Sequence, residues 1–312
     1  MNVFQGILLK LASVVLFAMM SALVRWVSDS VPVGQTVFFR SAIAIVPVAA
    51  IYAARGQLAA MVRTSRPFGH LSRGMIGVAG MFLSFAALAR LPLAEVTAIS
   101  FAAPLITVAL AALILKERVR IFRWSAVVVG FGGVLVMLSP HLNITSAPAH
   151  GPAATLGAIF ALLAAFSSAG ATIQTRRLTG SETNSAIVFY FSFFSALLGL
   201  ATLPFGWVMP SGPVLAALVA IGLIGGIAQL LMTASFRLAP ASVVAPFDYS
   251  SILWSFALGY AFFGEVPLPI VFVGAGIVIL AGLFVIFRER YLAQQRIKAL
   301  GLPASPPPPP PD

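Results

Sequence analysis

The sequence predicts an all-α integral membrane protein with ten transmembrane helices, arranged as two inverted five-helix repeats. Of its 312 residues, 60% are hydrophobic and only 9% are charged, and the mean hydropathy is +1.02. Apolar runs of about 20 residues, long enough to cross a hydrocarbon core of ~30 Å, recur along the whole chain. The two halves of the chain also resemble each other. Together these observations place the chain among multi-pass membrane proteins.

Proline, glycine and charged residues divide the chain into ten candidate spans. The segments are apolar on all sides, which favours helices over the alternating pattern of a membrane barrel. The first span has no basic region before it and no A-x-A site after it, so we expect a retained helix. The spans are 5–27, 34–54, 70–89, 92–115, 121–138, 153–175, 185–203, 213–236, 241–263 and 267–287.

These spans predict four parts of the chain. Residues 1–142 form the first repeat, 143–152 an external linker, and 153–287 the second repeat. Residues 288–312 are expected to form a cytoplasmic, disordered tail that ends in ASPPPPPPD. Such a proline-rich ending favours an extended, unpacked chain.

Arginine and lysine predict the orientation. With the N-terminus inside, fifteen of these residues fall in cytoplasmic segments, whereas only Arg25 and Arg90 fall outside. This asymmetry is typical of membrane proteins and predicts that both termini are cytoplasmic. The net charge of +11 therefore indicates membrane orientation, and we expect no nucleic-acid partner. The expected location is the inner membrane of a bacterium.

The repeat rests on matched segments in the two halves. GILLKLASVVLFAMMSALVRW, from Gly6, aligns with GAIFALLAAFSSAGATIQTRR, from Gly157. Farther along, a proline and a glutamate are 25 residues apart in both halves, as Pro92 with Glu117 and Pro240 with Glu265. Because each repeat has five spans, an odd number, the second must be inverted in the membrane. Inverted repeats are typical of alternating-access carriers with a site near the midplane.

The ten spans, the two halves and the acidic residue that closes the fourth span of each half resemble the EamA-type family of the drug/metabolite transporter superfamily. That residue lies in KER (116–118) and in GEV (264–266). The resemblance implies a central cavity formed by the first four helices of each half. The stretches SRPFGHLSRGMIGVAGMF (65–82) and APFDYSSILWSF (245–256) further resemble a bacterial branch with S-adenosylmethionine and riboflavin importers.

Asp248 is the strongest candidate for a binding site, because an ionisable residue within a span marks a site by default. Ser251 follows at i+3 on the same helix face, and Pro246 frees a backbone carbonyl beside it. Either Asp248 lines the cavity or it is a structural residue paired with a neighbouring helix. The repeat places Ser100 and Phe101 on the opposite wall.

Expected roles can be assigned to three further charged residues within spans. Asp248 and Glu95 are both candidates for proton coupling. The position of Glu95 near Pro92 favours a helix-capping role. Arg40 is expected to bind an anionic group or to pair with Glu95 or Asp248. Lys10 is expected to extend its amine to the inner membrane surface.

Aromatic residues would supply apolar walls for a flat substrate. Tyr249, Trp254 and Phe101 lie on segments expected to line the cavity, and together with Asp248, Ser251, Ser100 and Arg40 they complete the predicted substrate site. Cysteine is absent, and the three histidines share no metal-ligand spacing, so we expect no metal and no cofactor.

The sequence therefore predicts a secondary transporter of a small organic metabolite. Uptake of a vitamin-like or aromatic compound such as riboflavin is the leading hypothesis, and export of amino acids, drugs or other metabolites is the alternative. A membrane enzyme is disfavoured because no histidine or cysteine that could serve as base or nucleophile is expected at membrane depth. The expected partners are a small molecule and the lipid bilayer, with a homodimer as an open alternative.

Overall fold

The computed structural model describes residues 3–54, 56, 58–114, 121–140, 152–178, 181–239 and 241–299. Every regular element within these ranges is a helix, which confirms the all-α prediction for this part of the chain. The α-helices of the first half are α1 (Val3–Val27), α2 (Val33–Ala54), α3 (Leu58–Val62), α4 (Pro67–Leu88), α5 (Leu93–Ser100), α6 (Ala102–Ile114) and α7 (Ile121–Leu138). Those of the second half are α8 (Pro152–Leu178), α9 (Asn184–Ala201), α10 (Gly212–Leu238), α11 (Ala241–Val244), α12 (Ser251–Phe263) and α13 (Pro269–Ala299), with a 3₁₀ helix, η1 (Ala245–Ser250), before α12.

Eight of the described segments are long enough and apolar enough to cross a membrane. They comprise α1, α2, α4, the pair α5–α6, α7, α8, α10 and α13. Helix α9 is apolar but shorter, and the expected span at 241–263 is divided among α11, η1 and α12. The chain is therefore a multi-pass membrane protein.

The C-terminal helix is longer than the sequence predicts. The expected last span ends at 287, whereas α13 continues to Ala299. The segment from 288 to 299 is therefore helical, and the polyproline ending lies outside the described residues. The expected external linker also lies almost entirely outside them, as does Glu117.

The fourth span of each half is interrupted at a proline. In the first half, α5 ends at Ser100 and α6 begins at Ala102, and Pro104 cannot donate a backbone hydrogen bond to Ser100. In the second half, Pro246 lies in η1, where tighter turns replace α-helical ones. Both interruptions lie well inside the predicted spans, where a cavity or a neighbouring helix must satisfy the freed backbone groups.

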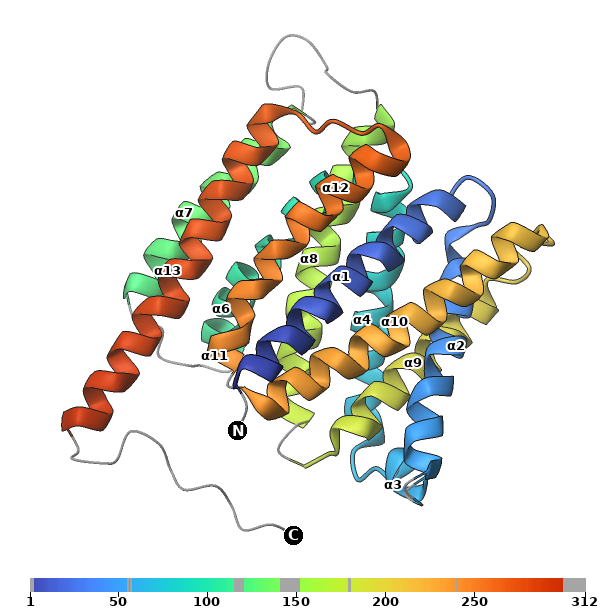
Figure 1. Ribbon diagram of the computed structural model, residues 1–312, viewed down its shortest axis with the longest axis horizontal. Coiled ribbons are helices and arrows are strands. Elements are labelled where there is room, and N and C mark those ends of the chain that lie inside the picture. The colour runs from blue at the N-terminus through green and yellow to red at the C-terminus, as the bar shows by residue number, and fades with distance from the viewer. Residues whose placement is uncertain are drawn as a thin grey trace.

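The two halves pack closely against each other (Figure 1). Helix α1 contacts α10, α4 contacts α8, α2 contacts α9, and α7 contacts α13 at one edge of the bundle. At that edge Gly133 and Gly274 face each other, and a Cβ on Gly274 would lie only 2.6 Å from the carbonyl oxygen of Gly133. These glycines thus allow the backbones of α7 and α13 to approach closely.

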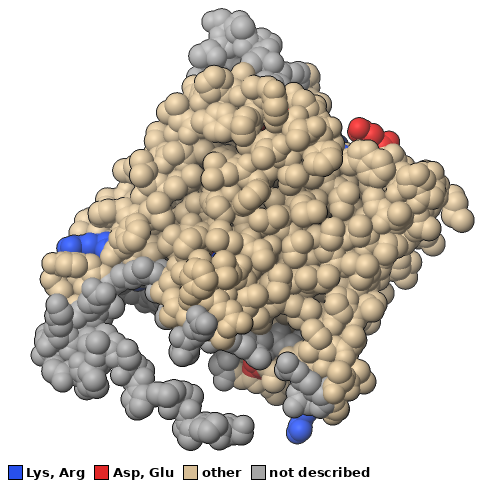
Figure 2. Space-filling model, in the orientation of Figure 1, with Lys and Arg blue, Asp and Glu red and all other residues tan. Residues whose placement is uncertain are grey.

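Charge is confined to the margins of the visible surface. Figure 2 shows a face that is almost free of lysine, arginine, aspartate and glutamate between the two ends of the helices. Large apolar side chains are exposed along several helices, among them Leu113, Phe262 and Leu280. An exposed apolar belt of this kind suits contact with lipid tails. Following the orientation predicted from arginine and lysine, we call the end where α1 begins and α13 ends the inner end of the bundle, and the opposite end the outer end (Figure 1).

Candidate functional site

A cavity of about 750 Å³ lies between the two halves. Its walls come from α1, α2 and α4 of the first half and from α8, α9, α10 and η1 of the second. The lining residues of α9 begin at Ile187, near the start of that helix, and those of α10 extend to Phe236, near its end. The cavity is therefore located towards the inner end of the bundle.

Asp248 lines this cavity and is paired with Lys10. The Nζ atom of Lys10 lies 2.6 Å from Oδ1 of Asp248, and the side chains are 2% and 51% exposed, respectively. Both roles considered for Asp248 are thus realised in one residue, because it faces the cavity and also pairs with a neighbouring helix. Such a pair avoids leaving a buried cation without a counter-charge.

The expectation for Lys10 is wrong. Its amine does not extend to the membrane surface, because the residue is buried and its Nζ lies 5.1 Å from the centre of the Phe236 ring. A partner 238 positions along the chain satisfies the charge, and no local pattern in the sequence reveals a contact of that kind.

Arg40 lines the cavity together with Arg73 from α4. Both guanidinium groups lie against the ring of Phe191, at 5.8 Å for Arg40 and 4.3 Å for Arg73. The Nε atom of Arg73 donates to the hydroxyl of Thr175, 3.2 Å away. Nε of Arg40 and Nη1 of Arg73 are buried and have no hydrogen-bond partner within the described part of the chain.

Sequence reasoning missed Arg73 and Phe191 as site residues. The sequence predicts Arg73 as one of the fifteen cytoplasmic orienting charges, because it lies only three residues after the expected start of the third span at 70. Helix α4 begins instead at Pro67, because proline is favoured in the first turn of a helix. That signal was present in RPFGHLSRGM, and it places Arg73 almost two turns inside the helix.

A second cavity, of about 350 Å³, adjoins the first. The two share four lining residues, Arg73, Ser168, Ala171 and Phe191. Ser100 lines this second cavity, and its hydroxyl donates to the carbonyl of Thr97 at 2.6 Å.

Phe101 and Tyr249 contact each other where the two interrupted spans cross. Their ring centres are 5.0 Å apart with the planes at 71°. A Cβ on Gly282 would collide with the hydroxyl of Tyr249, so that side chain points towards α13. Ser251 is half-buried and Trp254 is 42% exposed, and neither lines either of these two cavities.

Glu95 lies in the first turn of α5 and is 1% exposed. The unpaired amides at a helix N-terminus favour a carboxylate there, consistent with the capping interpretation. It lines neither of the two cavities described above.

Polar contacts join the two halves at the outer end. Arg25 donates from Nε to Oε1 of Glu265 at 3.2 Å, and the backbone N–H of Leu93 donates to Oε2 of the same carboxylate at 2.8 Å. The side chain of Gln35 is also hydrogen-bonded to the backbone of Val208, through both its amide nitrogen and its carbonyl oxygen. These contacts hold the first and second halves together above the cavity.

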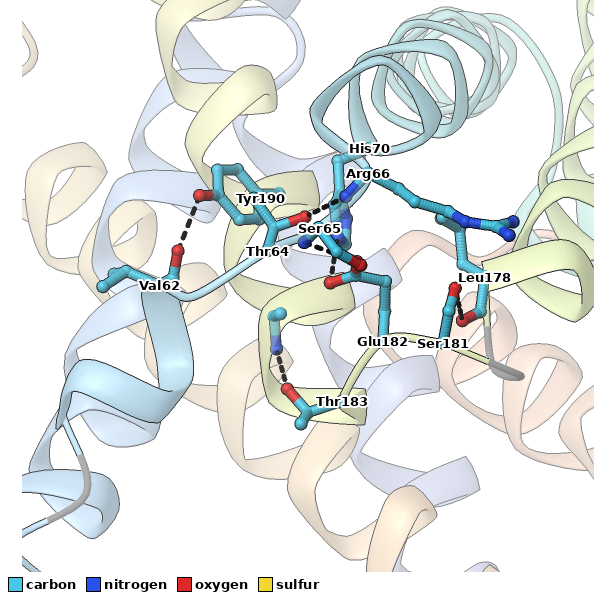
Figure 3. A network of polar contacts seen from close by, with 11 residues as sticks. Val62, Thr64, Ser65, Arg66, His70, Leu178, Ser181, Glu182, Thr183 and Tyr190 are labelled. Atoms are coloured by element: carbon cyan, nitrogen blue, oxygen red, sulfur yellow. Dashed lines mark hydrogen bonds and ion pairs between the residues drawn. The ribbon is translucent and has the colours of Figure 1, made fainter.

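A separate network lies at the inner end (Figure 3). The Glu182 carboxylate accepts hydrogen bonds from the backbone and hydroxyl of Ser65, at 2.9 and 2.8 Å, and lies 3.1 Å from Nε2 of His70. Burial alone would raise the pKa of the Glu182 carboxyl, but the hydrogen bonds from Ser65 and His70 outweigh it and lower that pKa to about 2. Glu182 therefore stays ionised and joins the segment before α4 to the segment before α9.

The described residues contain no group of three histidine, aspartate or glutamate side chains placed to hold a metal ion. What the bundle presents instead is a charged cavity among apolar helices, lined from both halves of the chain. This arrangement is typical of transporters that bind a substrate in a cavity between two halves.

The chain belongs to the EamA-like transporter family, within the drug/metabolite transporter superfamily. The family model matches twice, over residues 4–139 and 155–288. The chain is 32% identical over 253 residues to an S-adenosylmethionine uptake transporter of Rickettsia prowazekii, covering 81% of each chain. It is 33% identical over 233 residues to a riboflavin transporter of Rhizobium johnstonii, covering 74% of each.

The chain is also similar to an exporter in sequence and to a solved structure in fold. The chain is 28% identical to the pseudopaline exporter CntI of Pseudomonas aeruginosa, over 89% of this chain and 94% of that one. A solved crystal structure superposes with a TM-score of 0.60 over 92% of this chain and 98% of its own, at 19% identity, which shows the shared fold. The family and the relatives are transporters, not enzymes, and the relatives differ in substrate and direction.

Proposed function

We propose that this protein is a secondary transporter of the bacterial inner membrane that carries a small organic metabolite by alternating access. The observation that carries the proposal is the cavity, which is lined by charged residues from both halves at membrane depth. At its wall, Nζ of Lys10 from the first half lies 2.6 Å from Oδ1 of Asp248 from the second half. A site shared between two halves changes its exposure when one half rocks against the other.

The proposed architecture is ten spans in two inverted repeats, with both termini cytoplasmic. Two features support inversion. The contact of α1 with α10 has a counterpart in that of α4 with α8, as expected when the first and third helices of each repeat exchange roles. The interrupted spans also cross at Phe101 and Tyr249, which are related by the same offset as Pro92 and Pro240.

The conformation described here fits an inward-facing state. The cavity lies towards the inner end, while the contacts of Glu265 with Arg25 and Leu93 close the outer end. Alternating access then requires that these outer contacts break as the inner end closes.

We assign Asp248 to coupling, because it faces the cavity and its counter-ion Lys10 moves with the other half. Protonation of Asp248 would weaken its attraction to Lys10 and so bias the two halves towards separation. Glu95, in the first turn of α5, is a second candidate for this role. Ser100 and Arg40 are assigned to substrate contact.

Uptake of a nucleoside-like or vitamin-like compound is the favoured reaction. S-adenosylmethionine and riboflavin are the candidate substrates, because relatives at 32% and 33% identity carry those names. Export is the second candidate, supported by the likeness to the pseudopaline exporter over 94% of that chain.

Two cell experiments test the proposal. Expression of the chain in a bacterium that imports neither compound should allow uptake of labelled S-adenosylmethionine, or growth of a riboflavin auxotroph on low riboflavin. The Asp248→Asn variant, expressed to the same level, serves as the inactive control. Preloaded cells that lose label faster when they express the wild-type chain would instead establish export.

A further inference from the structure

The geometry points to an anion-binding subsite in the cavity, formed by Arg40 and Arg73, which takes a carboxylate or phosphate of the transported molecule. This inference rests on the proposed function, since the ligand is the substrate itself. Of the two candidate substrates, it favours S-adenosylmethionine, which carries a carboxylate, over riboflavin, which carries no anionic group.

The first observation is the uncompensated charge of the two arginines. Among the described residues that line the cavity, three are cations, and Asp248 is the sole acid. Asp248 is already paired with Lys10 at 2.6 Å. Arg40 and Arg73 thus give the cavity two positive charges without a counter-charge from its walls. A buried guanidinium is costly unless an anion compensates it.

The second observation is the set of donors left free. Arg40 is 8% exposed, and its Nε makes no hydrogen bond within the described part of the chain, as is also true of Nη1 of Arg73. Unpaired buried donors are rare in folded proteins, so these two nitrogen atoms indicate a binding partner from outside the chain. A carboxylate or phosphate matches the planar guanidinium fork, because its oxygens accept two parallel hydrogen bonds.

The third observation is that the surrounding chain holds these arginines in place. Both lie against the ring of Phe191, and Thr175 accepts a hydrogen bond from Nε of Arg73. A Cβ on Gly77 would lie 2.7 Å from Nη1 of Arg73, so this glycine provides room for the guanidinium. Side chains that are already oriented lose less conformational entropy when a ligand binds.

The subsite predicts a preference between closely matched ligands. S-adenosylmethionine carries a carboxylate, and decarboxylated S-adenosylmethionine differs by the loss of that group alone. Riboflavin 5′-phosphate likewise carries the phosphate that riboflavin lacks. In at least one pair the anionic member should bind more tightly, and the pair that shows this preference tells whether the subsite takes a carboxylate or a phosphate.

The test uses the purified full-length chain in detergent, as wild type and as the Arg40→Gln and Arg73→Gln variants. Arg90→Gln is the matched control, because Arg90 also lies over a ring, that of Phe160 at 5.2 Å, but is exposed outside the cavity. The first measurement is the thermal unfolding midpoint in inorganic phosphate and in chloride at equal ionic strength. The second is the dissociation constant for each member of the two ligand pairs.

We expect phosphate to raise the midpoint of the wild type and the control, and not that of either cavity variant. For at least one pair, the wild type should prefer the anionic member by about tenfold or more, and the cavity variants should lose most of that preference. If glutamine at either position prevents folding, Arg40→Lys and Arg73→Lys keep the charge but lose the fork. They should show a reduced preference.

The outcomes separate this inference from the proposed function. If phosphate stabilises the wild type and the control alone but no organic probe binds, the subsite stands and the proposed substrates are rejected. If the organic probes bind without preference for the anionic member, the subsite is overturned and the transport proposal stands. A wild type without a phosphate-specific rise in midpoint also overturns the subsite.

Discussion

Lys10 and Asp248 form an ion pair of 2.6 Å between helix α1 and the 3₁₀ segment that interrupts the ninth expected span. The lysine is buried, whereas the aspartate is half exposed to the cavity. The contact thus joins the two halves of the chain at the wall of the cavity that we propose as the substrate site. This ion pair therefore contributes both to the packing of the two halves and to the proposed transport.

Asp248→Asn should abolish transport and lower the unfolding temperature. The buried Lys10 then loses its counter-charge, which costs ~3–5 kcal/mol for a fully buried pair and less here, because Asp248 is partly hydrated. Adding Lys10→Met should restore much of the stability without restoring transport. Thermal unfolding in detergent and uptake assays measure the two effects. Normal uptake by Asp248→Asn would remove this residue from the mechanism.

Glu265→Gln should open the outer end of the bundle. It removes the charge that accepts hydrogen bonds from Arg25 and from the backbone N–H of Leu93. Because the chain has no cysteine, Thr172→Cys places a single thiol in the cavity. A membrane-impermeant maleimide added outside should label that thiol several-fold faster in the Glu265→Gln background. Arg90→Gln is the control, and equal labelling in all backgrounds would contradict this role for Glu265.

Glu182 should stabilise the inner end across the physiological pH range. Its folded pKa of about 2 lies below the ordinary value of 4.5, so its contribution is complete above about pH 4.5 and is lost as the pH falls towards 2. In a His70→Gln background, which removes the imidazole beside this carboxylate, Glu182→Gln should therefore change the unfolding temperature as much at pH 5.5 as at pH 7.5. A difference that vanishes by pH 5.5 would show that the carboxylate is not held as described.

Much of the fold could be predicted from the sequence, because span length, apolar composition and proline positions are local properties. Asp248 stood out for the same reason, as an acid in an apolar segment. Lys10 and Arg73 were misplaced because the roles of both depend on tertiary contacts or on a helix boundary. The sequence predicts Arg73 as an orienting charge near the inner surface, whereas α4 begins at Pro67 and carries Arg73 farther into the bundle.

The aromatic candidates illustrate a different limit. A helical segment predicted to face a cavity still has several faces, and the choice among them depends on its neighbours. Tyr249 points towards α13, where Gly282 leaves room for its hydroxyl, whereas Phe191 of α9 contacts both arginines. Periodicity alone could not distinguish these two environments.

Transport through this cavity is tested most directly by the purified Thr172→Cys chain in liposomes, with labelled S-adenosylmethionine and riboflavin supplied separately. We expect at least one compound to cross the membrane faster than in protein-free liposomes, and a bulky maleimide on the cysteine to stop that flux. The same reagent should leave the cysteine-free wild type active. Flux that persists after complete labelling, or no flux of either compound in either direction, would contradict the proposed transport through this cavity.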